Sequence, residues 1–268
     1  MRISWLGQVR IYVGKCFRTF ANERGWKILI SSAIIALIVA WVSGSEMFIT
    51  YRATRSGAFA LISACIWMGI FNSIQSICRE RAIIKREYRT GLYLSSYISA
   101  HMIYQMALCL AQAFITATIV FIFRSPPSAG IFMPAYFEML ITFFVVIFAA
   151  DVLGLLVSSI AKTENAAMTA MPFVLILQLV MSGVVFELEG LASVLSVFTV
   201  SRWGVNAICS IANVARMPDA RFVENFNPNN YTHTSGHLAQ IWFILMVFAV
   251  LYGVFALVSL KFIDKDKR

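Results

Sequence analysis

Residues 79–91, RERAIIKREYRTG, decide how the rest of this chain must fold. They hold five basic and two acidic residues between two long hydrophobic runs. Such a segment cannot lie in the hydrocarbon core of a bilayer, where one charged side chain costs at least ~2.5 kcal/mol. Because Ile83, Ile84 and Tyr88 are interleaved with the charges, we expect an organised cytoplasmic loop whose apolar face receives a partner.

The composition of the whole chain indicates a membrane protein. Of its 268 residues 60% are hydrophobic and 13% are charged, whereas soluble domains carry about 25% charged residues. Apolar runs of about 20 residues are long enough to cross a bilayer as helices, and the alternating ~10-residue segments of a transmembrane barrel are absent. We therefore predict an all-α polytopic membrane protein with one transmembrane domain over 1–268. Six spans are expected, at about 27–44, 56–78, 93–123, 134–160, 166–186 and 238–263.

The basic residues predict the orientation of these spans. Segments 1–27, 79–91, 161–165 and 261–268 together carry 16 basic and 6 acidic residues, whereas the rest of the chain carries six basic and seven acidic residues. Because basic residues concentrate on the cytoplasmic side, we expect both termini in the cytoplasm and the protein in the cell membrane. The high isoelectric point then reflects topology and contact with anionic lipid, and no nucleic-acid partner is expected.

Two segments outside the spans also predict helices. Residues 4–21 repeat apolar side chains at helical spacing with basic ones on other faces, which predicts an amphipathic helix in the membrane interface. A targeting presequence is the alternative, although no processing site follows. In the external segment 187–237, the first part is too apolar for a loop and too interrupted for a span. Short re-entrant helices are therefore expected before the sixth span.

Motifs for catalysis are missing from the sequence. Gly14-Lys15 lacks the spacing and the Ser or Thr of a nucleotide-binding loop, and no nucleophile motif is present. We expect no metal site, no bound cofactor and no catalysis by this chain alone. Asp151 is the one clear acid at membrane depth, and it needs a partner, water or a proton there. Two interpretations stay open: an ion site, or a buried acid bonded to Ser158 or to a group on another span.

Spans two and five combine thioether and aromatic side chains, which suit an adaptable hydrophobic pocket. Ordinary helix packing is the alternative. The candidates are Met68, Met168, Met171 and Phe173. Pro172 predicts a break near the start of the fifth helix. Four amides are expected to form interhelical hydrogen bonds or to line a cavity: Asn72, Gln75, Gln112 and Gln178.

The order of these features resembles the type-2 ABC exporter permeases, and in particular the G-subfamily of ABC transporters. The likeness rests on Arg79-Glu80-Arg81, on Arg86-Glu87-Tyr88-Arg89-Thr90-Gly91-Leu92-Tyr93 and on Ser95-Ser96-Tyr97. Gly154-Leu155-Leu156 with 161–166, and the stretch 201–207, support it. In the last stretch Gly204-Val205-Asn206 departs from the usual Tyr-x-x-Glu, so a role for a glutamate there is unsupported.

The resemblance implies a mechanism and a set of partners. Two permease chains, a homodimer or a pair with a paralogous permease, would enclose a substrate path. Each would dock on a separate ABC ATPase subunit that binds ATP and Mg, as is usual in bacteria. Docking would use the interfacial helix and a coupling helix at 79–91, with Arg79, Glu80, Arg81, Lys85, Arg86, Glu87 and Arg89 as coupling residues. Of these, Glu80, Arg86 and Glu87 would hold the loop by ion pairs. Met68, Asn72, Met168, Met171 and Phe173 would face the cavity.

The function expected on this basis is export of a hydrophobic or amphipathic substrate, such as a lipid, peptide or drug-like molecule, by alternating access. An ion-coupled secondary transporter or channel using Asp151 is the alternative, although inverted repeats and several intramembrane acids are lacking. A membrane enzyme acting on lipid would need convergent catalytic groups, which the sequence does not show.

Overall fold

The structure is a computed structural model that describes residues 4–124, 127, 129–186, 188–220 and 231–262. Every regular element in these ranges is a helix, which confirms the all-α prediction. In chain order the helices are α1 (Trp5–Asn22), α2 (Trp26–Val42), α3 (Tyr51–Ser73), α4 (Ser76–Arg89), α5 (Leu94–Phe123), α6 (Ala135–Ile160), α7 (Glu164–Val180), α8 (Gly190–Ser196), α9 (Val200–Ile211), the 3-10 turn η1 (Val214–Arg216) and α10 (Ser235–Leu260).

Four helical stretches among the described residues are long and apolar enough to cross a membrane, or up to six if each of two bent helix pairs is one span. The four are α5, α6, α10 and the nearly continuous α3 and α4. The predicted first and fifth spans are α2 and α7, which have 17 residues each. At 1.5 Å per residue each is about 26 Å long, and α2 is bent by 71° from α1. The chain is a multi-pass membrane protein.

The centre of the bundle is the crossing of α3 and α6, which approach each other at two glycines. A Cβ on Gly69 would lie 2.4 Å from the carbonyl oxygen of Ile147, and one on Gly154 would lie 2.7 Å from that of Ile70. Only hydrogen fits at these positions, so the two backbones pack almost directly on each other. Helices α5, α9 and α10 pack around this pair.

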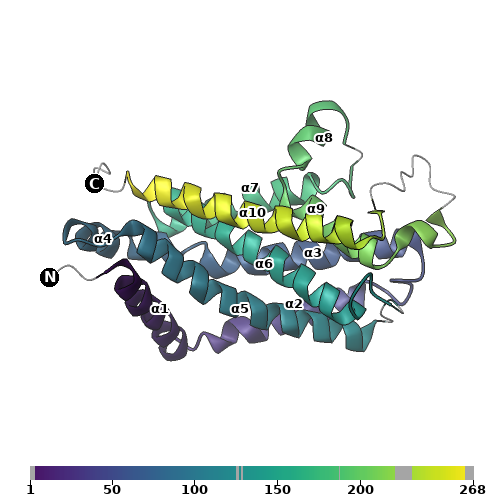
Figure 1. The fold of residues 1–268 in the computed structure, drawn as a ribbon, viewed down its shortest axis with the longest axis horizontal. Coiled ribbons are helices and arrows are strands. Elements are labelled where there is room, and N and C mark those ends of the chain that lie inside the picture. The colour runs from purple at the N-terminus through teal and green to yellow at the C-terminus, as the bar shows by residue number, and fades with distance from the viewer. Residues whose placement is uncertain (1–3, 125–126, 128, 187, 221–230, 263–268) are drawn as a thin grey trace.

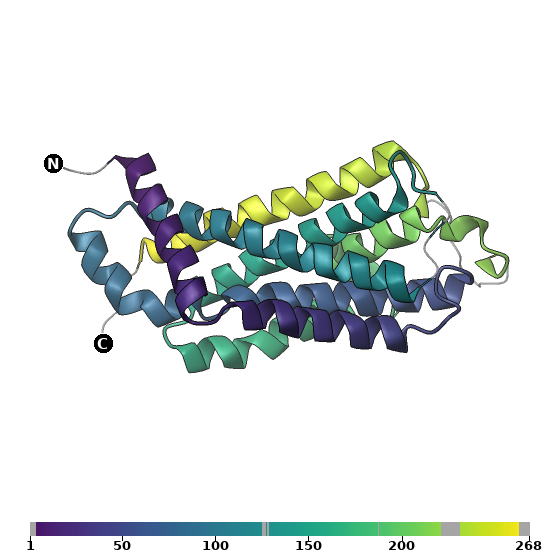
Figure 2. The same ribbon diagram turned by 90° about the horizontal axis from the view of Figure 1, so that it is seen from below.

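Three parts of the chain meet at one end of the long bundle: α1, α4 and the end of α10 (Figure 1). Helix α1 runs steeply across the bundle and packs on α5 (Figure 2). The charge distribution predicts a common end for these segments. The side of the membrane that this end faces stays a prediction.

The segment before α10 contains the short helices that the sequence predicts. Helices α8 and α9 meet at 77°; α8 projects from the bundle (Figure 1), while α9 packs on α3 and α6. Residues 187 and 221–230 of this segment lie outside the described part of the chain. The predicted break at Pro172 is wrong, because α7 continues through it. Proline removes one backbone hydrogen bond, and burial of Met171 and Leu175 on either side holds the helix.

Candidate functional site

Most of the charged segment at 79–91 is helical, as the family resemblance implies. Helix α4 begins at Ser76, after a change of direction at Ile74 and Gln75, and ends at Arg89. The first N–H groups of a helix have no partner within it. Here the hydroxyl of Ser158 on α6 accepts hydrogen bonds from the N–H groups of Ile77 at 3.0 Å and of Cys78 at 3.1 Å. The start of α4 is therefore fixed to α6.

The inner face of α4 is fastened to α1 and α5 by two glutamates. The Glu80 carboxylate lies 2.8 Å from the ammonium of Lys15 on α1, and it accepts a 3.1 Å hydrogen bond from the buried hydroxyl of Tyr97 on α5. Two turns later, Glu87 accepts a 2.5 Å hydrogen bond from Tyr12 on α1. Burial, and then the hydrogen bond to Glu87, raise the pKa of Tyr12, so its hydroxyl remains a donor. We call these contacts of Lys15, Glu80, Tyr12, Glu87 and Tyr97 the α1–α4 clamp.

Two more contacts extend the attachment of α1. The amide of Gln8, which is 9% exposed, donates to the carbonyl of Gly91 at 3.2 Å and accepts from the N–H of Tyr93 at 2.9 Å. At the other end of α1, Glu23 lies 3.4 Å from Arg79. Both side chains of that second pair are mostly exposed, and exposed ion pairs contribute little. The stronger attachment is therefore at Gln8 and in the clamp.

The outer face of α4 is exposed and carries basic and apolar side chains together. Arg79, Ile83 and Arg86 follow one another at helical spacing on this face, with Arg89 one turn further on. Ile83 is 41% exposed on this face, whereas Tyr88, which is 36% exposed, lies on another side of the helix, since five residues turn it by about 140°. Apolar side chains ringed by arginine are enriched at protein interfaces. The predicted coupling residues thus divide: Arg79, Arg86 and Arg89 lie outward, whereas the two glutamates point into the chain.

The remaining predicted coupling residues lie at the sides of α4. Arg81 donates to the carbonyls of Ser159 at 2.8 Å and Ala161 at 3.2 Å. These carbonyls lie at the end of α6, where helices leave acceptors without partners, so Arg81 joins α4 to the turn between α6 and α7. Lys85 is half-buried. Of the expected ion pairs, the one at Glu80 is present, but its cation is Lys15 of the same chain.

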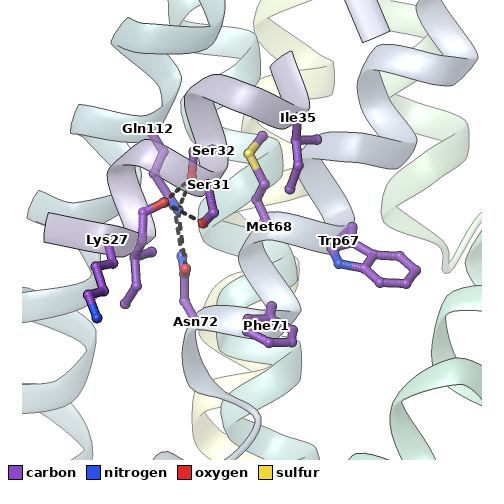
Figure 3. A pocket seen from close by; sticks show the side chains of 10 residues that line it. Lys27, Ser31, Ser32, Ile35, Trp67, Met68, Phe71, Asn72 and Gln112 are labelled. Carbon is purple, nitrogen blue, oxygen red and sulfur yellow. Dashed lines mark hydrogen bonds between the residues drawn. The ribbon is translucent and has the colours of Figure 1, made fainter. Parts of the chain in front are cut away.

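A pocket of about 410 Å³ lies between α2 and α3, in the half of the bundle nearer to α4 (Figure 3). Small-molecule sites commonly have 300–1,000 Å³. Its lining residues are Lys27, Ile28, Ser31, Ser32, Ile35, Trp67, Met68, Phe71, Asn72 and Gln112. Met68 and Asn72 therefore line a cavity. Met168, Met171 and Phe173 do not line it: Met171 is 4% exposed in the bundle, whereas Met168 and Phe173 are 36% and 70% exposed on α7.

The polar side of the pocket is a closed network. Asn72 and Gln112 exchange two hydrogen bonds, of 2.7 and 3.2 Å, which confirms their predicted interhelical role. Gln112 also donates to the hydroxyl of Ser32 at 2.7 Å, and Ser32 donates to the carbonyl of Ile28 at 2.8 Å. Both N–H groups of Gln112 are used, so the network joins α2, α3 and α5 without any ligand.

Asp151 lies near the centre of α6 and is 0% exposed. Neither carboxylate oxygen has a hydrogen-bond partner among the described residues. The predicted bond to Ser158 is wrong, because seven residues separate the two side chains by about 10.5 Å along one helix, and Ser158 caps α4 instead. Ser73 on α3 donates to the backbone carbonyl of Asp151, not to its carboxylate.

The clamp residues of α1 are the functional candidates that sequence reasoning missed. The pattern of α1 marks Lys15 as polar, but Lys15 and Glu80 are 65 positions apart. Sequence reasoning also missed the acid Glu138, which is 0% exposed and accepts hydrogen bonds from the N–H groups of Ile131, Phe132 and Met133. It fixes the turn that precedes α6. The spacing of Glu138 after this turn was the only signal available.

Fold and site together define a multi-pass helical membrane protein with an exposed basic and apolar helix at one end of its bundle. The chain belongs to the ABC-2 type transporter family, whose model matches residues 8–212. The matched range runs from α1 into the end of α9 and includes α4 and the pocket. The resemblance to ABC permeases is thereby confirmed, and the chain is an ABC transport permease. Permeases of this family work with an ABC ATPase.

A relative of known annotation supports the same family. The ABC transporter ATP-binding/permease protein Rv1747 of Mycobacterium tuberculosis is 26% identical over 193 residues, which cover 70% of this chain and 22% of that protein. The chain thus matches about a fifth of the relative's length. The name of the relative describes a protein that has both ATP-binding and permease functions.

Proposed function

We propose that this chain is the permease part of an ATP-driven exporter and that the ABC ATPase docks on the outer face of α4. The chain moves a hydrophobic or amphipathic substrate out of the cytoplasm or the inner leaflet by alternating access. It acts as a homodimer or with a paralogous permease, in the cytoplasmic membrane of a bacterium, with both termini inside. ATP and Mg bind to the ATPase, which is a separate subunit.

The two-faced character of α4 is the observation that carries this proposal. Its inner glutamates are occupied by Lys15, Tyr12 and Tyr97, so they stabilise the chain itself. Its outer face exposes Ile83 and Arg86 at the end of the bundle. An exposed apolar side chain beside arginines suits a protein interface.

Movement of α4 would reach the rest of the permease through contacts already described. The clamp transmits a movement of α4 to α1 and α5, and Ser158 transmits the movement to α6. The direct chain connection transmits the movement to α3. ATP-driven closure of two ATPase subunits would therefore act on several spans at once. This gives the ATPase a mechanical route to the substrate path.

Reversal of one outward charge tests the docking face. Arg86→Glu should weaken binding to the ABC ATPase at least about fivefold, since a central interface residue contributes more than ~1 kcal/mol, and should lower transport-coupled ATP hydrolysis. The matched control is Arg216→Glu, an equally drastic change at an exposed arginine of η1, away from α4. If Arg86→Glu binds and couples as the control does, α4 is not the docking helix.

An ion-coupled carrier or channel is the second candidate, because Asp151 is buried without a partner among the described residues. Vesicles that contain this chain alone should then show a flux driven by an ion gradient, and Asp151→Asn should abolish it. Flux that appears only after an ATPase and ATP are added removes this candidate.

A further inference from the structure

Lys27 is the one charged side chain of the pocket between α2 and α3, and it has no carboxylate partner among the described residues. The nearest acid along the chain, Glu23, is paired with Arg79. Lys27 is exposed and lies one residue after the start of α2. In Figure 3 it stands at one edge of the pocket, with Trp67 on the far side. The pocket is therefore cationic at one end.

The other walls of the pocket are apolar and open to the outside of the bundle. Met68 forms part of the wall and is 3% exposed, whereas Trp67 and Phe71 are 50% and 55% exposed. Such side chains on the surface of a membrane-spanning helix lie against lipid or against a ligand dissolved in it. A molecule can therefore enter sideways from the membrane, between α2 and α3.

The hydrogen bonds among the amides of the pocket favour a ligand whose body is apolar. Asn72, Gln112 and Ser32 already form hydrogen bonds with one another. A strongly polar ligand body would have to replace those bonds, and a buried amide left without a partner is unfavourable. An apolar body requires no such exchange. A cationic head would be repelled by Lys27, and an anionic head would be attracted to it.

We propose that this pocket binds a membrane-dissolved amphipath with an anionic head and an apolar tail. The head lies on the ammonium of Lys27, and the tail lies along Ile35, Met68 and Trp67. Lysines near the ends of membrane helices place the charged group at the headgroup level and the stem in the apolar region, which matches this arrangement. The inference rests on the proposed function only in taking this ligand to be the exported substrate. Binding itself is measurable without transport.

The test is photolabelling of the full chain in nanodiscs of neutral phosphatidylcholine. The probe is a photoreactive alkyl phosphate, and the comparison probe has the same alkyl chain with a trimethylammonium head. The phosphate probe should label α2 and α3 saturably. Lys27→Gln should weaken its binding about fivefold, as expected for one lysine at a membrane surface, and should not weaken binding of the cationic probe. Arg10→Gln, at an exposed arginine of α1, is the matched control and should leave labelling unchanged.

A second variant tests the pocket rather than the charge. Met68→Trp fills the cavity and should remove saturable labelling, while Ile34→Trp, on an exposed part of α2 outside the pocket lining, should not. Labelling that never saturates, is equal for both heads and ignores Met68→Trp means annular lipid only and overturns the proposal. Displacement of the probe by inorganic phosphate alone overturns the amphipath and indicates a simple anion site.

The outcomes separate this inference from the proposed function. If labelling behaves as expected while Arg86→Glu keeps full ATPase coupling, the pocket stands and the proposal that the ATPase docks on α4 fails. If Arg86→Glu uncouples the ATPase while labelling is unsaturable, the docking proposal stands and the pocket inference fails.

Discussion

The ion pair between Lys15 and Glu80 should hold α1 on α4 with a measurable free energy. Its nitrogen and oxygen lie 2.8 Å apart, and the two side chains are 37% and 25% exposed. Fully exposed pairs contribute about 0.2–1 kcal/mol. Because this pair is partly sheltered and hydrogen-bonded, we expect a coupling energy near the top of that range, about 1 kcal/mol.

A double-mutant cycle of Lys15→Met and Glu80→Gln isolates this energy. Glutamine keeps an oxygen that accepts the hydrogen bond from Tyr97, so only the charge is lost. Glu80→Ala should destabilise the chain further, by about 1–3 kcal/mol, because it leaves the Tyr97 hydroxyl, on a residue that is 0% exposed, without its acceptor. Glu80→Ala is thus expected to be less stable than Glu80→Gln.

Hydrogen exchange of the α1 amides measures the opening of this contact. A loss of about 1 kcal/mol speeds exchange about fivefold, and the second substitution should add little to the first. Alkylation of Cys16 is an independent measure. Burial, followed by the charge of Glu80, raises the pKa of the Cys16 thiol to about 11, so it should react slowly at pH 8 and faster when α1 opens.

The control cycle uses Arg79 and Glu23, whose side chains are 62% and 55% exposed, and should give a coupling energy near zero. A coupling energy for Lys15 and Glu80 that is equally close to zero, with unchanged exchange in α1, would refute the clamp. The route from α4 to α1 would then be lost from the mechanism.

Three further outcomes are expected. Partial burial is the largest single influence on the pKa of the Asp219 carboxyl and raises it, but hydrogen bonds from the first N–H groups of α3 lower the pKa overall. The ionised carboxylate of Asp219 therefore stabilises the fold at neutral pH, and this stabilisation is lost as the pH falls through the lowered pKa. Asp219→Asn removes the negative charge at the start of α3 and should lower stability by about 0.3–1 kcal/mol at pH 7, and thermal unfolding should show this difference shrinking below about pH 4. Gly69→Ala should destabilise the chain by about 1–3 kcal/mol in the same assay, because its Cβ would meet the Ile147 carbonyl. Gly236→Ala, in α10, meets open space and should not destabilise the chain. Asp151→Asn removes no hydrogen bond to the carboxylate among the described residues and should keep ATP-driven transport; a folded variant without transport would favour an ion site.

The spans and the charged helix could be predicted because they depend on composition. Hydropathy finds α3, α5, α6 and α10 at close to their observed ranges, and a dense run of charges must leave the bilayer wherever it occurs. The helical structure of residues 76–89 was harder to predict from periodicity, since the segment has few apolar residues. The family resemblance, rather than periodicity, suggested a coupling helix there.

The inward direction of Glu80 and Glu87 could not be predicted from the sequence. It depends on the 71° bend between α1 and α2, which lays α1 across the bundle. Lys15 thereby reaches Glu80, 65 positions away, and Tyr12 reaches Glu87, 75 positions away. The misassigned partner of Asp151 has a similar origin. A spacing of seven places Ser158 on the same side of α6, but two turns away.

The nearly continuous path from α3 into α4 has the geometry of a lever. The outward arm, α4, has 14 residues and is about 21 Å long, whereas Asn72 lies two residues, about 3 Å, on the other side of the break at Ile74. A displacement of several ångströms at the far end of α4 would produce a displacement of less than one ångström at Asn72, with a proportionately larger force. A hydrogen bond of 2.7 Å such as that from Asn72 to Gln112 tolerates only a displacement of that size. The amide pair is therefore placed to open or close in response to a stroke delivered at the tip of α4.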